Sequence, residues 1–287
     1  MGLSGTEQYL RVVKLAATSK QGQGKDYSGL RCKFTIEKTS ESTANTSKIE
    51  IYNLNSDSRT FLEGKEMRVV LEAGYPGATE ILTVGNITRA ISVHNHPDWI
   101  TTIESGDGQR ELKDSHLDVS FAPGTTFQAI FLQGVKALGV TLGPTVFAIP
   151  QIATGGFSFS GTAKELMDKL AKRFSLEWSV QDGAVQVSTD GVPLPGIAIS
   201  VSSTTGLIGN VVKTQVSTAE KNADSADNGN FDGIQFQMLI NGEVKPGRLI
   251  QVISQQANGF YKVRKVVFEG DTHDGPWFAN VEAEPIK

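Results

Sequence analysis

Histidines are the residues of this sequence best suited to metal chemistry, and two of the four, His94 and His96, stand two positions apart. On a β-strand this spacing directs both rings to one side, where two imidazoles can begin a zinc site. Pro97 follows at once, and no cysteine or third histidine lies nearby, so we favour exposed histidines at a hairpin tip. The run 271–274 also combines carboxylates with a histidine, but its place between two predicted strands favours a polar turn.

The sequence has none of the short motifs that carry nucleophilic or phosphate chemistry. It contains no Gly-x-Ser-x-Gly elbow, phosphate-binding loop or zinc-protease helix, and its carboxylates lie mostly at turns and on polar strand faces. The single cysteine, Cys32, shares the apolar parity of Phe34 and Ile36, which indicates a small core residue. We therefore predict a protein that is not an enzyme, with no cofactor and no metal.

The three tryptophans, Trp99, Trp178 and Trp277, are a second candidate for ligand binding. Exposed indole rings can stack on sugars. All three lie in strand-like stretches beside apolar neighbours, so we favour packing in a core or at a subunit interface.

Composition sets the class of protein. A chain of 287 residues with 39% hydrophobic residues can bury two or three modest cores. The formal charge of -4 and the scattered lysines and arginines give no reason to expect a nucleic-acid groove. No run of about 18 apolar residues and no secretion signal is present, so we expect neither export by a leader peptide nor membrane anchoring.

Alternating polar and apolar residues predict strands in the first third of the chain. The pattern is clean over 31–37 and 48–51, and Asn55 is placed to cap a short helix. In the stretch 80–93 the apolar parity switches at Gly85-Asn86, which predicts a bulge or a tight bend there. The run 94–98 then forms a hairpin tip.

The middle third has helical patterns. Two capping boxes, Thr125 with Gln128 and Thr162 with Glu165, each precede an amphipathic stripe. Asp182-Gly183 lies between two short apolar runs and predicts a β-hairpin.

The last third returns to strands, so the order along the chain is β, α+β, β. We predict a mainly β fold with an α+β insertion and domain boundaries at 1–110, 111–190 and 191–287. The polar stretch 218–230 is predicted to be an exposed loop. No convincing residue-level repeat relates the two β-rich parts.

Several short patterns, in a fixed order along the chain, carry a family resemblance. They are Asn53-Leu54-Asn55 before a short helix, Trp99 in the strand after the hairpin tip, Gly206-Leu207-Ile208-Gly209-Asn210, and Pro246-Gly247 ahead of a strand. With them the chain resembles the baseplate hub proteins of contractile-tailed bacteriophages over nearly its whole length. The physical roles of these residues are structural: strand ends, a helix cap, a bend and a turn.

This resemblance implies a homotrimer in which each subunit has two tail-tube-like β-barrels flanking a small α+β domain. Three subunits would present six barrels to the hexameric tail tube protein above and a true threefold axis to the trimeric spike or tip protein below. It also implies contacts with baseplate wedge or other baseplate proteins, and a lumen for tape-measure protein and transiting DNA. The expected location is the tail baseplate of a virion assembled in the cytoplasm of the bacterial host.

Two segments depart from the family pattern: the long stretch 218–230, and the Pro- and Gly-rich segment 143–159. Both segments could contact a neighbouring protein in the baseplate, but we favour the interpretation that they are solvated filler. Two other functions stay open, namely a hub-like component of a bacterial contractile injection system, and a carbohydrate-binding or carbohydrate-degrading tail protein.

Overall fold

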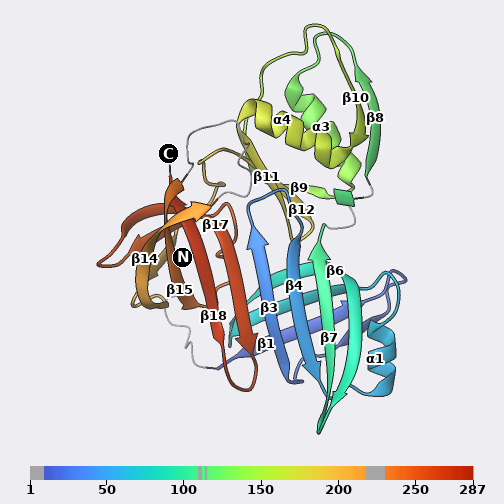
Figure 1. The fold of residues 1–287 in the computed structure, drawn as a ribbon, viewed down its shortest axis with the longest axis vertical. Helices are drawn as coiled ribbons and strands as arrows, with labels where there is room; N and C mark the ends of the chain where they lie inside the picture. Colours follow the sequence, from blue (N-terminus) through green and yellow to red (C-terminus); the bar gives the residue numbers. More distant parts are fainter. Residues whose placement is uncertain (1–9, 109–111, 114, 218–229, 287) are drawn as a thin grey trace.

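A computed structural model describes residues 10–108, 112, 113, 115–217 and 230–286 (Figure 1). Within these residues the protein is mainly β, with three short helices, which confirms the predicted class at this level. The strands form one sheet of 13 strands and two small sheets of two and three strands in the described ranges. None of the described helices has the length and apolar character needed to cross a membrane.

The first strand set precedes residue 108 and includes one short helix. Its elements are β1 Val12–Thr18, β2 Gly24–Asp26, β3 Cys32–Thr39, β4 Asn45–Tyr52, α1 Ser56–Leu62, β5 Arg68–Tyr75, β6 Ala78–Asn95 and β7 Asp98–Asp107. Buried and exposed residues alternate along β3 and β4, as predicted, because each strand turns one face to the core. The Asn55 side chain accepts a hydrogen bond from the backbone N–H of Ser58, which confirms the predicted cap of α1.

The predicted bulge at Gly85-Asn86 is wrong. Both residues pair regularly with β5, and the register instead shifts on either side of them, at Leu82 against β5 and at Thr88 against β7. Gly85 has a different role, since a Cβ atom there would lie 3.1 Å from the carbonyl oxygen of Gly106. The glycine therefore allows β6 and β7 to approach closely.

The α+β unit lies between the two strand sets. Its elements are β8 His116–Phe121, α3 Phe127–Leu138, β9 Thr141–Val146, β10 Phe157–Thr162, α4 Ala163–Phe174, β11 Leu176–Gln181 and β12 Ala184–Thr189. The capping box of Thr162 and Glu165 is confirmed at α4, as is the hairpin turn between β11 and β12.

Two predictions for this unit are wrong. Helix α3 is capped by Thr126, which accepts from the N–H of Ala129, whereas the Thr125 hydroxyl donates to the carbonyl of Ala122. The segment 143–159 is not solvated filler, because Ile149 is fully buried in the core beneath the helices. Its first residues belong to β9, which pairs in parallel with β12.

The second strand set completes the large sheet. Its elements are β13 Ile199–Ser202, β14 Leu207–Ser217, β15 Asn230–Leu239, β16 Leu249–Ile253, β17 Asn258–Asp271 and β18 Trp277–Pro285. The stretch 218–229, predicted to be a loop, lies outside the described residues.

The two strand sets have the same strand order. Neighbouring strands follow the order β3-β4-β7-β6-β5-β1 in the first set and β14-β15-β18-β17-β16-β13 in the second. Read in parallel, the two orders match β3 with β14, β4 with β15, β7 with β18, β6 with β17, β5 with β16 and β1 with β13. The matched strands also come in the same order along the chain. The pairs match in direction except the last, which is antiparallel for β1 and β5 but parallel for β13 and β16. One architecture therefore occurs twice.

This repeat extends to individual residues, contrary to our sequence prediction. Trp99 in β7 pairs with His94 of β6, and Trp277 in β18 pairs with Gly270 of β17. Five residues later, Glu104 pairs with Arg89 just past the register shift in β6. In the same way Glu282 pairs with Lys265 just past the shift in β17. Trp99 and Trp277, and Glu104 and Glu282, are thus equivalent positions.

The two sets are joined into one open sheet. Strand β17 pairs with β3 from Lys265↔Thr39 to Asp271↔Lys33, and Figure 1 shows β1 crossing behind β3 and β4. No strand pairing among the described residues closes either set into a barrel. The predicted separate barrels are replaced by two curled sets in one sheet because β17 provides an edge to which β3 bonds.

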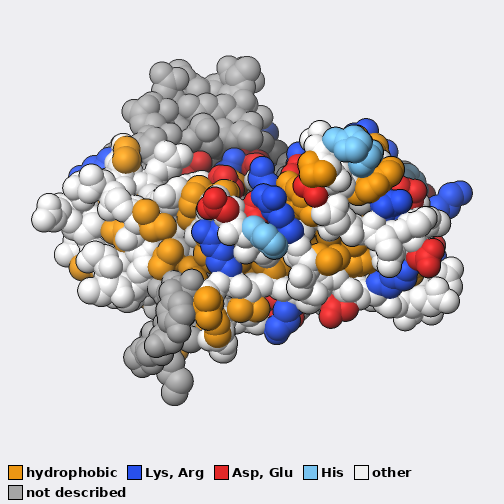
Figure 2. All heavy atoms as spheres, turned by 90° about the horizontal axis from the view of Figure 1, so that it is seen from below, with side chains coloured by type: hydrophobic (Ala, Val, Ile, Leu, Met, Phe, Trp, Pro, Cys, Tyr) orange, Lys and Arg blue, Asp and Glu red, His pale blue; other side chains and the backbone are white. Residues whose placement is uncertain are grey.

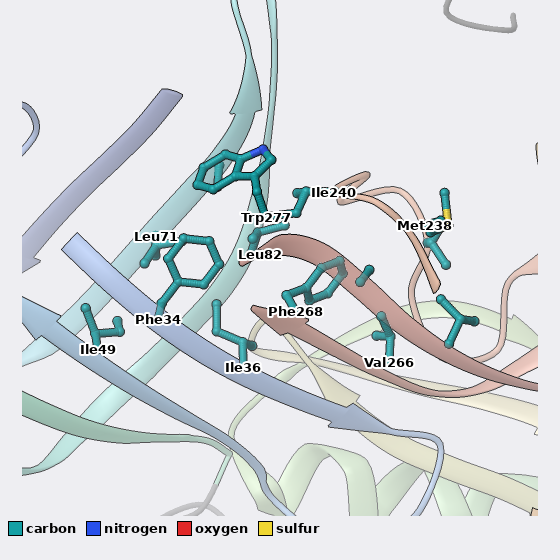
Figure 3. Close-up of a cluster of buried hydrophobic side chains, with 14 of the residues drawn as sticks. Phe34, Ile36, Ile49, Leu71, Leu82, Met238, Ile240, Val266, Phe268 and Trp277 are labelled. Atoms are coloured by element: carbon teal, nitrogen blue, oxygen red, sulfur yellow. The ribbon is translucent and has the colours of Figure 1, made fainter. Parts of the chain in front are cut away.

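One hydrophobic core fills both strand sets. Side chains of the first set, such as Phe34 and Leu71, lie beside those of the second, such as Phe268 and Trp277 (Figure 3). The rings of Phe34 and Trp277 meet edge to face with centroids 5.8 Å apart. A second core lies under α3 and α4. The division of the chain at residues 110 and 190 stays our proposal for the domain boundaries.

Candidate functional site

The two histidines lie at the tip of the β6–β7 hairpin. Their ring centroids are 4.4 Å apart, and the His94 ring stacks on Trp99 at 4.9 Å. No group of three or more His, Cys, Asp and Glu side chains in the described part of the chain is placed to hold a metal ion. Seen from below, histidine side chains lie among hydrophobic side chains and charges of both signs (Figure 2).

The tryptophans do not form a shared sugar-binding surface. Trp178 and Trp277 are buried, at 3% and 7% exposure. Trp99 is 36% exposed, so it is not a core residue, and one face of its ring carries the Arg59 guanidinium 4.2 Å from the centroid. A sugar would have to displace the partners of this ring.

Four of the pattern residues come together where β4 ends and β7 begins. The Asn53 side chain donates to Asp98 (2.8 Å) and accepts from the backbone N–H of Trp99 (3.0 Å). Leu54 points into the core, and Asn55 caps α1. This cluster fixes the root of the β6–β7 hairpin.

The other pattern residues lie in the second strand set. The Gly206 carbonyl accepts from the N–H of Leu239, and the register of β14 shifts across Gly209 and Asn210, between Ile208 and Val212. Leu207 packs against the large core. Pro246 and Gly247 form the turn before β16, where a Cβ atom on Gly247 would lie 2.7 Å from Leu194. All these contacts are structural.

A buried ionic cluster that the sequence analysis missed holds the α+β unit to both strand sets. Asp182, in the β11–β12 turn, accepts from Lys38 of β3 at 2.6 Å and from Lys245, ahead of β16, at 2.8 Å. The Lys38 side chain is completely buried. Burial disfavours ionisation of Asp182, but the two ammonium groups outweigh it and hold the pKa of this carboxyl below its ordinary value.

Asp107, at the end of β7, completes this cluster. Its carboxylate accepts from the backbone N–H groups of Asp182 and Gly183. Burial raises the pKa of Asp107 to about 6, and the neighbouring Asp182 carboxylate adds to the rise. A polar hollow of about 420 Å³ opens beside it.

A second ionic cluster lies on strand β11 of the same hairpin. Glu177 of β11 accepts from Lys262 and Arg264 of β17, each at 2.5 Å. The Lys262 side chain is completely buried, and Glu284 lies 3.7 Å from Arg264. Burial raises the pKa of Glu284. Carboxylates on one hairpin thus bind cations from both strand sets.

A signal for these clusters exists in the sequence. Lys38 shares the parity of Cys32, Phe34 and Ile36, so its position on the strand predicts burial. A buried ammonium group requires a nearby carboxylate. The sequence does not say which one, because Asp182 is distant along the chain.

The solvent face of the large sheet carries paired polar side chains in both strand sets. Ion pairs join Lys48 to Glu50 at 2.8 Å and Lys265 to Glu37 at 2.6 Å. Further along, Gln235 donates to Glu282 at 3.0 Å. These side chains of both charges form close pairs, as is typical of a solvent-exposed surface.

The fold is that of bacteriophage tail proteins. The structure matches the 43 kDa tail protein of prophage MuSo2 from Shewanella oneidensis with a TM-score of 0.66 and 13% identity, over 96% of this chain and 98% of that one. The tail protein of Neisseria meningitidis MC58 matches at 0.63 and 13%, over 96% and 97%.

A component of the E. coli type VI secretion system, itself described as similar in structure to the T4 bacteriophage tail proteins gp27 and gp5, matches at 0.62 and 11%, over 90% of this chain and 74% of that one. No protein-family model matches the sequence, and no curated protein sequence matches it.

Proposed function

We propose that this chain is a non-enzymatic structural component of a phage tail, the hub of its baseplate. The observation that carries the proposal is the repeated strand order of the two sets. A chain with two copies of one architecture lets a trimer present six similar units to a hexameric tube while keeping a threefold axis for a trimeric spike. Each curled set takes the place of one tube-type barrel.

The proposed partners are those that such a ring would contact. The tail tube protein stacks on one end of the ring, the spike or tip protein on the other, and wedge or other baseplate proteins contact the outside. The polar face of the sheet lines the channel through which tape-measure protein and DNA pass. The ionic clusters at Asp182 and Glu177 fix the α+β unit against the ring.

A hub-like part of a contractile injection system is the second candidate. The similarity to the E. coli secretion component, with a TM-score of 0.62, supports it. Both functions need the same ring, so the oligomeric state tests them together.

Light scattering coupled to size-exclusion chromatography measures that state. We expect the mass of three 30.8 kDa chains across a concentration series. A stable dimer that binds oligosaccharides would contradict the hub and favour a carbohydrate-binding tail protein.

A further inference from the structure

Strand β17 shows how one strand set bonds to the next. One side of it pairs with β18 along most of its length. The other side pairs first with β16, ending at Lys262, and then, from Lys265, with β3 of the first set. Arg264, between these two partners, is the residue skipped in the register with β18. The bulge at Arg264 thus marks the point where this side of β17 stops pairing with its own strand set and begins to pair with the first set.

Strand β6, the counterpart of β17, has the same design with one partner absent. Its pairing with β5 ends at Asn86, and two residues later Thr88 is skipped in the register with β7. Beyond Thr88, no strand of the described chain pairs with the side of β6 opposite β7. This free edge carries Ile91 and Val93, which are 37% and 56% exposed.

Strand β14, the counterpart of β3, has the complementary free edge. Its sole strand partner in the described ranges is β15. Val212 on β14 is 58% exposed. Figure 1 shows β14 and the β6–β7 hairpin on opposite sides of the molecule, so one chain cannot bring the two edges together.

We propose that the free edge of β6 pairs antiparallel with β14 of a second copy of this chain, as β17 pairs with β3 within one chain. The inference rests on the proposed function and specifies its subunit interface. An exposed strand edge is a site for pairing with another chain, and a head-to-tail contact of this kind can close into a ring.

The pairing of β17 with β3 within one chain also predicts the register in which β6 of one copy pairs with β14 of the next. Glu269, five residues past the skipped Arg264, pairs with Thr35 of β3. Val93 is five residues past Thr88 and is therefore the counterpart of Glu269.

Val212 is the counterpart of Thr35. In the first set, a row of paired residues runs from Thr35 through Lys48 to Glu104. In the second set, the corresponding row runs from Val212 through Gln235 to Glu282. Because Glu104 and Glu282 are equivalent positions, Thr35 and Val212 are equivalent too. Val93 of one copy thus faces Val212 of the next. Two of the most exposed valines of the chain cover each other in this arrangement.

Disulfide trapping tests this register. Directly opposite residues of antiparallel strands have Cβ atoms about 4.5–5.5 Å apart, close enough for a disulfide after small adjustments. The double variant Val93→Cys/Val212→Cys, oxidised in solution, should lose most of its monomer band to covalent dimers and trimers on a non-reducing gel. The native Cys32 gives little background because it is buried and its thiol pKa is raised to about 12.

The matched control is Val93→Cys/Ile253→Cys, since Ile253 is 44% exposed but belongs to β16, away from both free edges. It should stay largely monomeric on the same gel. Two results would overturn the inference and leave the proposed function standing. One is equal cross-linking of the two variants. The other is no cross-linking of Val93→Cys/Val212→Cys although light scattering gives a trimer. A chain that never associates would instead overturn the proposed function.

Discussion

At the scale of single residues, the completely buried lysines Lys38 and Lys262 determine how the parts of the molecule are held. An ammonium group without a partner is costly in a protein interior, and each of these has one carboxylate within 2.6 Å. The partners, Asp182 and Glu177, come from the same hairpin of the α+β unit. These charges therefore specify where that unit docks.

Asp107 gives this joint a pH dependence. Its pKa is raised from 3.8 to about 6, mainly by burial, so the folded protein binds this proton more tightly than the unfolded chain. The resulting stabilisation is complete below the ordinary value and is lost as the pH rises through about 6. From about pH 5 to about pH 7.5 the stability of the wild type relative to Asp107→Asn should fall by about 1 kcal/mol.

Urea denaturation of both proteins at the two pH values measures this difference. The exposed change Asp57→Asn serves as the control and should show no such trend. A wild type that becomes more stable relative to Asp107→Asn as the pH rises would contradict the assignment.

The histidine pair is predicted to have no structural metal. The double change His94→Ala/His96→Ala removes two exposed rings at a hairpin tip, so the melting temperature and the trimer mass should stay nearly the same. Elemental analysis should find no zinc that depends on these residues. Zinc bound by the wild type and lost from the variant, together with a large drop in melting temperature, would show a metal site.

At the scale of elements, the β11–β12 hairpin is the part that binds both strand sets. Glu177→Gln removes the charge that Lys262 and Arg264 share, and the buried lysine loses the carboxylate to which it donates a hydrogen bond. We expect the free energy of unfolding to fall by about 3 kcal/mol.

Urea denaturation also measures this loss. The control is Glu72→Gln, in which the lost ion pair joins Glu72 to Lys14 at the surface, and it should change stability little. Equal effects of the two substitutions would mean that the buried cluster does not hold the unit in place.

Single elements were predictable where a local pattern dictates them. The alternation in β3 and β4 and the box of Thr162 and Glu165 depend on residues a few positions apart, so they can be seen in the sequence. The one bulge predicted in β6 was misplaced because the position of a bulge depends on the register with a partner strand. The burial of Ile149 was missed since no periodic pattern marks its segment.

At the scale of the whole molecule, the two strand sets act as one sheet with one core. The pairing of β17 with β3 joins residues more than 200 positions apart, and no local pattern in either strand specifies the other. The repeat escaped the sequence analysis because the equivalent positions, such as Trp99 and Trp277, are few and follow turns of different length. The order of β-rich, α+β and β-rich parts was predictable, but their union was not.

The central claim is that two repeated units in one chain let three copies form a ring of six. Two-dimensional class averages of the purified particle, viewed along its axis by electron microscopy, test this most directly. We predict a closed ring with six similar lobes around a central hole and threefold symmetry, with extra density from the α+β unit at alternate positions. A ring with another number of lobes, or a particle without a central hole, would contradict it.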